Sequence, residues 1–119
     1  MPGSVSSHDQ SALFEGGYYS IVDGETFSVA KVLKLEEETV HIRLYKQLFL
    51  QRPRSIDPGA LTLGTIHDED GFGMAHVPLR LAAFMEHQPM FLTYAEVKPE
   101  ELYGYNFWKE SADRSLLEF

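Results

Sequence analysis

The stretch between residues 17 and 47 constrains the fold of this chain most strongly, because its hydrophobic pattern has the two-residue period of a β-strand. Apolar and polar side chains alternate in Thr39-Val-His-Ile-Arg-Leu-Tyr45. Successive strand residues point to opposite faces of a sheet, so one face receives the apolar side chains Val40, Ile42 and Leu44. The other face receives His41, Arg43 and Tyr45, and we expect His41 to be exposed to solvent there.

Two turn signals divide this stretch into three strands. Asp23-Gly24 suits a two-residue hairpin turn, whose backbone needs positive φ values. The acidic run from Glu36 to Glu38 suits a second, solvated turn. The segments 18–22 and 27–35 are rich in the Tyr, Val and Ile residues that favour strands. The sequence therefore predicts an antiparallel meander of three strands.

The segments Asp23-Gly-Glu-Thr-Phe-Ser-Val-Ala-Lys-Val-Leu33 and Val40-His-Ile-Arg-Leu-Tyr45 resemble the strand core of Tudor- and agenet-type SH3-like barrels. This resemblance implies a small, strongly bent barrel. Members of these families often read methylated side chains with a cage of aromatic rings. On this chain, the resemblance assigns the cage to four aromatic residues: Tyr18, Tyr19, Phe27 and Tyr45. A reader of a modified side chain is therefore one hypothesis for the function.

The two-residue period is lost after Tyr45. Pro53 and Pro58 each fix φ and remove a backbone donor, which predicts an irregular connection. Short strands are predicted at 60–66 and at 72–77, with a glycine-bounded loop between them.

The last third of the sequence mixes helix and strand signals. Pro78 suits the first turn of a helix that continues over 79–87. The run 90–97 has apolar residues at both odd and even positions, which predicts a strand buried on both faces.

A helix is predicted at 99–109, because proline at its first position is followed by two acids near the positive end of the helix dipole. Gly104 weakens this helix by about 1 kcal/mol relative to alanine. A strand through Tyr103, Tyr105 and Phe107 is therefore the alternative.

Together these elements predict an α+β fold: a small bent antiparallel sheet or partly open SH3-like barrel with one or two short helices, the last near the C-terminus. A chain of 119 residues is long enough for one such domain, which we place at 13–119. Residues 1–12 are rich in serine and poor in large apolar side chains, so we expect a flexible tail there.

The chain is acidic, with a formal net charge of −8 from 10 basic and 18 acidic side chains. Nucleic-acid binding is not expected, because such affinity comes mainly from neutralising phosphates. No apolar run reaches the length of a membrane helix, which argues against a membrane partner. The start of the chain lacks the basic and apolar regions of a signal peptide, and cysteine is absent, so we expect a cytoplasmic protein.

Recognisable catalytic motifs are absent from the sequence. It contains no HExxH, P-loop, GxGxxG or GxSxG pattern, and nothing in it indicates a cofactor. A small metal-dependent enzyme is a further hypothesis, because a divalent cation could be held by His67, Asp68, Asp70 and His76. A solvated loop without metal is the simpler interpretation of these residues.

The acidic charge is concentrated in the second half of the chain. Residues 59–119 carry four basic and ten acidic side chains, and Asp68, Glu69 and Asp70 stand together before Gly71. Clustered acids attract basic proteins through their long-range field. The leading hypothesis is therefore a non-catalytic, acidic protein-interaction module for a basic partner. Small size and acidity are also typical of immunity-type inhibitors, which cover the basic cleft of a toxin.

Overall fold

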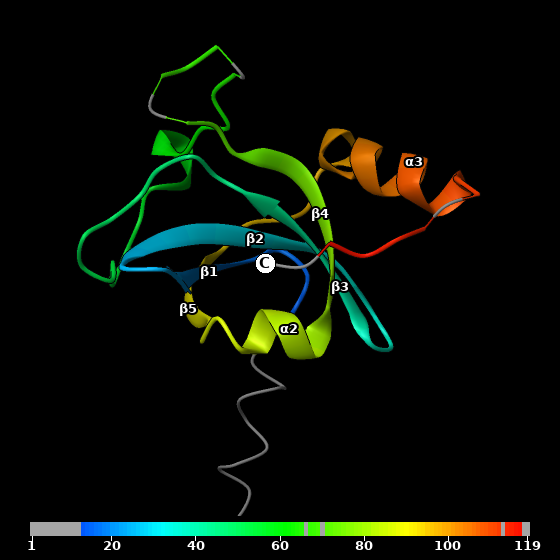
Figure 1. The fold of residues 1–119 in the computed structure, drawn as a ribbon, viewed down its shortest axis with the longest axis horizontal. Helices are drawn as coiled ribbons and strands as arrows, with labels where there is room; N and C mark the ends of the chain where they lie inside the picture. Colours follow the sequence, from blue (N-terminus) through cyan, green and yellow to red (C-terminus); the bar gives the residue numbers. More distant parts are fainter. Residues whose placement is uncertain (1–12, 66, 70, 113, 118–119) are drawn as a thin grey trace, which may run out of the picture.

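The computed structural model describes residues 13–65, 67–69, 71–112 and 114–117. Its strands are β1 (Gly17–Asp23), β2 (Thr26–Glu36), β3 (Thr39–Leu44), β4 (Met74–Arg80) and β5 (Met90–Tyr94) (Figure 1). A short helix, α2 (Leu81–Met85), follows β4, and the 3-10 helix η3 (Pro99–Leu102) runs directly into α3 (Tyr103–Glu110). The expected α+β class is confirmed, with its last helix near the C-terminus. The tail expected at 1–12 lies outside the described residues.

The predicted meander is confirmed. β1 pairs antiparallel with β2, and β2 pairs antiparallel with β3. Gly24 lies in the first turn with a φ of 64°, a conformation that glycine adopts without a steric penalty. The turn signal and the period-two pattern agree, which explains why this region was predictable.

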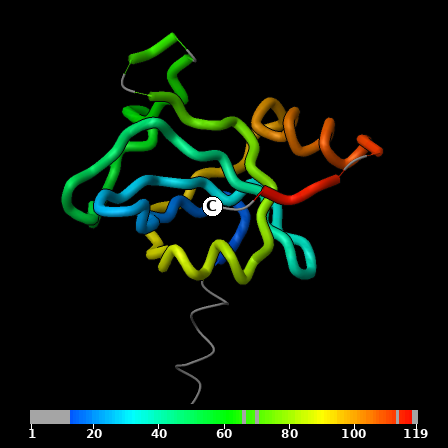
Figure 2. Tube along the Cα trace, in the orientation of Figure 1, coloured from blue at the N-terminus to red at the C-terminus, as the bar shows by residue number. Residues whose placement is uncertain are grey.

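The sheet has the strand order β4-β3-β2-β1-β5, so β4 and β5 form its two edges. The chain leaves β3 in a long connection and returns at β4, and β5 then pairs antiparallel with β1 (Figure 2). Register shifts interrupt the ladders of β1 with β5, β2 with β3, and β3 with β4. Such bulges bend strands and increase their twist. The result is a bent, open antiparallel sheet.

One face of the sheet forms the main core. It carries the buried side chains Tyr19, Ile21, Ala30, Val32, Val40, Ile42, Val77 and Leu79. Helix α2 adds Phe84, which is fully buried among them. Figure 1 shows α2 at the end of β4, whereas α3 lies beside an earlier part of the same strand.

The opposite face is covered as well. The connection 45–63 packs Phe49, Ile56, Leu61 and Leu63 against Tyr18, Val29 and Tyr45. Farther along this face, Tyr105 and Trp108 of α3 contact the ring of His41, with centroids 4.7 and 4.6 Å away. The expectation that His41 is exposed is therefore wrong, because α3 excludes solvent from it.

The middle of the chain departs from the prediction at three points. Residues 60–66 form no strand in their described part, and the 3-10 helix η2 (Pro58–Ala60) leads into irregular backbone. Pro78 lies inside β4 rather than at a helix start, which an edge strand tolerates. Helix α2 consequently begins only at Leu81 and is shorter than predicted.

The C-terminal region resolves the alternatives at 99–109 in favour of the helix. Close packing explains the glycine at position 104 of this helix, because a Cβ atom there would lie 2.5 Å from the Cβ of His76. The prediction that β5 is buried on both faces is wrong. Its position at the sheet edge leaves Met90, Phe91 and Tyr94 exposed.

None of the helices in the described part of the chain is long and apolar enough to cross a membrane.

Candidate functional site

Large side chains are exposed on the edge strand β5 and on the segment before β1. Phe14, Met90, Phe91 and Tyr94 have exposed fractions of 39%, 57%, 47% and 56%. The ring of Phe14 lies 5.2 Å from that of Phe91 and 5.9 Å from that of Tyr94, measured between centroids. Hereafter the three rings of Phe14, Phe91 and Tyr94 are called the edge patch.

The turn before β1 brings Phe14 to β5. Gly16 has a φ of 94°, and a Cβ atom there would lie 2.5 Å from Cε2 of Tyr94. Only glycine fits this position, because both the backbone conformation and the close approach exclude a side chain. The backbone amide of Ala95 donates to the carbonyl of Gly16 at 3.0 Å, which joins the turn to the end of β5.

A groove of about 450 Å³ runs beside the edge patch. Its lining consists of Arg52, Pro53 and Arg54 from the long connection and Met90, Phe91 and Leu92 from β5. Arg52 is held in place by two contacts: its guanidinium lies 5.1 Å from the ring centre of Phe27, and Nη1 donates to the carbonyl of Gln88 at 2.9 Å. We call this feature the arginine groove.

The structure separates the four aromatic residues predicted for a cage. Tyr18 and Tyr45 stack with centroids 6.0 Å apart and are buried under the long connection. Tyr19 points to the opposite face of the sheet and belongs to the main core. Phe27 lies at the hairpin end of β2, where it pairs with Phe49. The four rings therefore do not surround one pocket.

A cation of the chain itself lies over one of these rings. Lys31 Nζ is 5.1 Å from the ring centre of Tyr18 and 2.9 Å from Glu101 Oε1. The side chain of Lys31 is only 2% exposed. Hydrogen bonds from Lys31 and from the backbone of Lys98 keep the pKa of Glu101 below its usual value, although burial alone raises it. Lys31 and Glu101 thus form a buried ion pair that anchors η3 to β2.

The predicted acidic loop is only partly free to meet a partner. Lys46 Nζ donates to Asp68 Oδ2 at 2.8 Å, and the backbone amide of Thr65 donates to the same oxygen at 3.1 Å. These bonds lower the pKa of the Asp68 carboxyl. Glu69 is exposed beside it, whereas Asp70 lies outside the described residues.

The proposed metal ligands do not come together in the described residues. His67 is exposed in the loop, whereas His76 lies on β4 beneath α3. The structure shows no group of three or more metal-ligating side chains in the part of the chain that it describes.

A polar chain of Glu36, His41 and His76 lies between the sheet and α3, in which His41 is buried, His76 is partly buried and Glu36 is exposed. His41 Nε2 is 3.0 Å from Glu36 Oε1, and His41 Nδ1 is 2.9 Å from His76 Nε2. A carboxylate only accepts, so Nε2 of His41 donates to it. In neutral His41 the Nδ1 atom then accepts, and His76 Nε2 is its donor.

Burial lowers the pKa of both histidines. It lowers the pKa of His76 to about 4, and the neighbouring His41 contributes in the same direction. Burial also lowers the pKa of His41, although the Glu36 carboxylate opposes this effect. Both ring nitrogens of His41 are bonded to protein groups, so neither is available as a general base. The polar chain instead helps to hold α3 against the sheet.

Helix α3 closes this polar chain. The hydroxyl of Tyr105 donates to Glu36 Oε2 at 2.7 Å. This bond is the largest cause of the lowered pKa of Glu36, while burial raises the pKa of Tyr105 to about 12. Trp108 Nε1 donates to the carbonyl of Ser115 and so ties the following segment to the helix.

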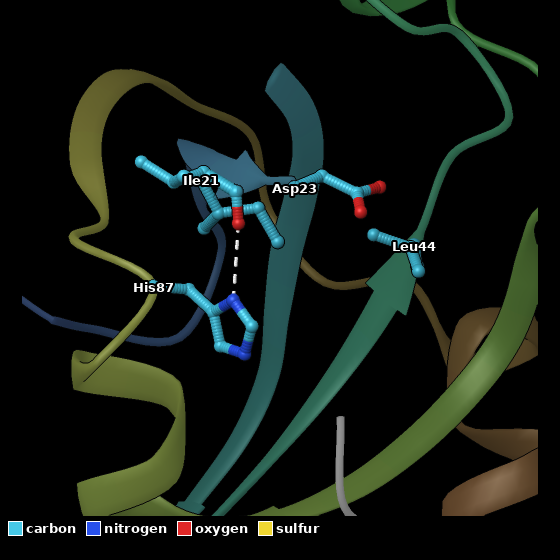
Figure 3. A pocket seen from close by; sticks show the side chains of 5 residues that line it. Ile21, Asp23, Leu44 and His87 are labelled. Carbon is cyan, nitrogen blue, oxygen red and sulfur yellow. Dashed lines mark hydrogen bonds between the residues drawn. The ribbon is translucent and has the colours of Figure 1, made fainter. Parts of the chain in front are cut away.

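A small cavity of about 140 Å³ opens between β1 and the segment after α2 (Figure 3). Its lining is mainly apolar and comes from Ile21, Val22, Asp23, Leu44 and His87. His87 Nδ1 lies 3.0 Å from the carbonyl oxygen of Val22, which makes it the donor in this contact. The side chain of His87 therefore links the segment to β1, as Figure 3 shows.

The edge patch and the arginine groove were not predicted from the sequence. Arg52 and Arg54 lie in a stretch of sequence, 43–54, that contains no acidic residue. This is the one sequence feature that indicated the position of the arginine groove. The exposure of Phe91 and Tyr94 had no sequence signal, since an apolar run is the same in a central and an edge strand.

No family model matches the sequence, and no curated protein or solved structure shows significant similarity to this chain.

Proposed function

We propose that this chain is a non-catalytic protein-interaction module that binds a partner protein through the edge patch. The observation that carries the proposal is the contiguity of Phe14, Phe91 and Tyr94 on an open sheet edge. Large apolar patches are rare on proteins that bind nothing. Aromatic residues are enriched where interfaces bury the most surface.

The edge strand adds a second reason to expect a partner. An exposed edge presents backbone donors and acceptors that can pair with another chain, and proteins usually protect such edges with charges, bulges or covering segments. The pairing of β5 with β1 is irregular at one point, but Met90, Phe91 and Tyr94 leave the open edge of β5 apolar. A bound partner would remove both the apolar surface and the free backbone groups from water.

An aromatic-cage reader agrees less well with the geometry. Such a site needs an open ring face for a methylated cation. The ammonium of Lys31 already lies over Tyr18, and Tyr45 stacks on the same ring. We therefore favour the interaction module over a reader of modified side chains.

The proposal is tested by photo-cross-linking in the cells that make the protein. A benzophenone amino acid is placed at Tyr94 in one variant and at Phe107 in another. Phe107 is a suitable comparison because it is an aromatic residue with 81% exposure on α3, in a different part of the fold. We expect a covalent adduct of defined mass from position 94 only. Adducts from position 107 alone, from both positions equally, or from neither would contradict the proposal.

A basic partner is a second candidate, through the acidic loop. Lys46 and Thr65 hold Asp68, so Glu69 projects from a defined loop conformation. Glu69→Lys changes the exposed charge without breaking the Asp68 contacts. If a basic protein docks there, this variant slows association at low salt more than Glu110→Lys, an equal charge change on α3. Equal rates for both variants would place the contact elsewhere.

A further inference from the structure

We propose that the edge patch and the arginine groove together bind an extended segment of a partner protein in which acidic and apolar residues alternate. The segment pairs with β5 as a sixth strand of the sheet. This inference rests on the proposed interaction function, and it adds the chemistry and the conformation of the bound segment.

The first observation is the open backbone of β5. Among the described residues, β5 pairs with β1 on one side and with no strand on the other. An extended peptide that joins such an edge gains affinity from main-chain hydrogen bonds. Its specificity then comes from the surfaces that flank the two faces of the added strand.

The two faces of β5 differ in chemistry. Leu92 belongs to the cluster with Phe49 and Ile56, on the face that the long connection covers. Phe91 contacts Tyr19 of the main core, with ring centroids 5.8 Å apart, and so belongs to the opposite face. Phe91 also lines the arginine groove, so the groove and the edge patch meet at this ring. Arg52 and Arg54 therefore flank one side of the edge, and the rings of Phe14 and Tyr94 flank the other.

This difference sets the sequence of the bound segment. Successive residues of a strand point to opposite faces. Every second residue of an added strand therefore meets Arg52 and Arg54, while the residues between them meet Phe14 and Tyr94. Carboxylates suit the first set, because arginine binds them with paired hydrogen bonds. Aliphatic or aromatic side chains suit the second set.

Charge complementarity favours this occupant. Lys31, Arg43 and Lys46 all lie within 4 Å of carboxylate oxygens of the chain. By contrast, neither Arg52 nor Arg54 has a carboxylate partner within the described residues, and no acid stands among the lining residues of the groove. The two arginines are therefore available to an acidic ligand.

The overall charge of −8 acts against any acidic partner at long range. Salt screens this repulsion over about 8 Å at physiological ionic strength, whereas direct contacts with arginine persist. We therefore expect slow association at low salt and faster association as salt increases. The same net charge disfavours a second copy of this chain as the occupant.

The test measures fluorescence anisotropy with a labelled peptide of about nine residues, which spans β5 with short extensions at both ends. The probe alternates glutamate with valine and phenylalanine. Four comparison peptides are used: one with lysine replacing glutamate, one of the same composition with the glutamates adjacent, and two with alternate backbone nitrogens methylated, one for each register. We expect the alternating probe to bind at least about tenfold more tightly than the lysine peptide, the adjacent-glutamate peptide and the methylated peptide whose methyl groups face β5. The peptide methylated in the other register should keep most of its binding, because its donors to β5 are intact.

Two protein variants locate the binding. Arg54→Glu reverses an exposed charge, and Tyr94→Ser removes a ring from the edge patch. Each should weaken binding by about tenfold or more, while Phe107→Ser leaves it unchanged. Circular dichroism of each variant confirms that its fold is retained. Equal binding of the lysine or the adjacent-glutamate peptide would overturn the proposal.

The outcomes of the two experiments together separate this inference from the proposed function. If Tyr94 cross-links to a partner but no peptide binds, the inferred segment is wrong and the interaction function stands. If neither occurs, both are wrong. A dimer in analytical ultracentrifugation that Tyr94→Ser disrupts would instead identify a second copy of the chain as the occupant, which overturns the inference.

Discussion

The imidazole rings of His41 and His76 lie nearly parallel beneath α3, with centroids 5.1 Å apart and an angle of 9° between their planes. His76 donates to His41, and His41 donates to Glu36. When both rings are neutral, Nε2 of His76 is the donor and Nδ1 of His41 is the acceptor.

The first prediction concerns acid. The pKa of His76 falls from an ordinary value of 6.5 to about 4 on folding, so the unfolded chain binds protons that the folded chain does not. Stability is therefore complete above about pH 6.5 and decreases as the pH falls towards 4. We expect a loss of about 2 kcal/mol between pH 7 and pH 4.5, measured by urea denaturation.

The His76→Gln variant isolates this effect. Glutamine can donate to His41 but does not titrate, so the stability of the variant should depend less on pH over the same interval. Glu36 and Glu101 also have lowered pKa values, and both add a loss in the same direction at lower pH. A wild-type stability that stays constant from pH 7 to pH 5 would contradict the prediction.

The second prediction concerns the buried ion pair. Lys31→Met leaves the Glu101 carboxylate without its nearest cation, since Arg43 Nη1 is 3.9 Å away. Removing one partner of a buried pair costs about 3 kcal/mol. The double variant Lys31→Met with Glu101→Gln should recover part of this loss, because no isolated charge stays buried. Thermal melts of the wild type, Lys31→Met and the double variant would rank their stabilities. A double variant less stable than Lys31→Met would contradict the prediction.

The third prediction concerns Gly104. Alanine favours an isolated helix over glycine by about 1 kcal/mol. At this position, however, the added Cβ atom would lie 2.5 Å from the Cβ of His76, so α3 must move away from β4. We expect Gly104→Ala to destabilise the protein by about 2 kcal/mol. Asn106→Ala, at an exposed position of the same helix, serves as the control and should be neutral or slightly stabilising. Equal effects of the two changes would show that α3 is not tightly packed.

The fourth prediction concerns metal. His76 is bonded to His41, and Asp68 is bonded to Lys46, so neither is arranged with His67 around a common point. A chelator should leave the melting temperature unchanged, as should added zinc or manganese. A fall with chelator that zinc restores would revive the hypothesis of a metal-dependent enzyme.

Local patterns in the sequence were sufficient to predict two regions of the fold. The meander of β1, β2 and β3 followed from the Asp23-Gly24 turn and from the alternation at 39–45. The C-terminal helix followed from Pro99 and the two acids after it. Turn geometry, strand period and helix capping act between residues a few positions apart, so they leave a signal in the sequence itself.

The candidate site left almost no such signal. The alternation at 39–45 defines two faces of a strand but not what covers them, and α3 covers His41 from a distance of more than sixty residues along the chain. Likewise, the apolar run of β5 is the same whether a neighbouring strand is present or not. Only the strand order, with β5 placed beyond β1, leaves Phe91 and Tyr94 at an edge and sets Arg52 and Arg54 beside them. Burial and proximity depend on contacts between distant segments, and for this reason the tertiary structure alone decided where the candidate site lies.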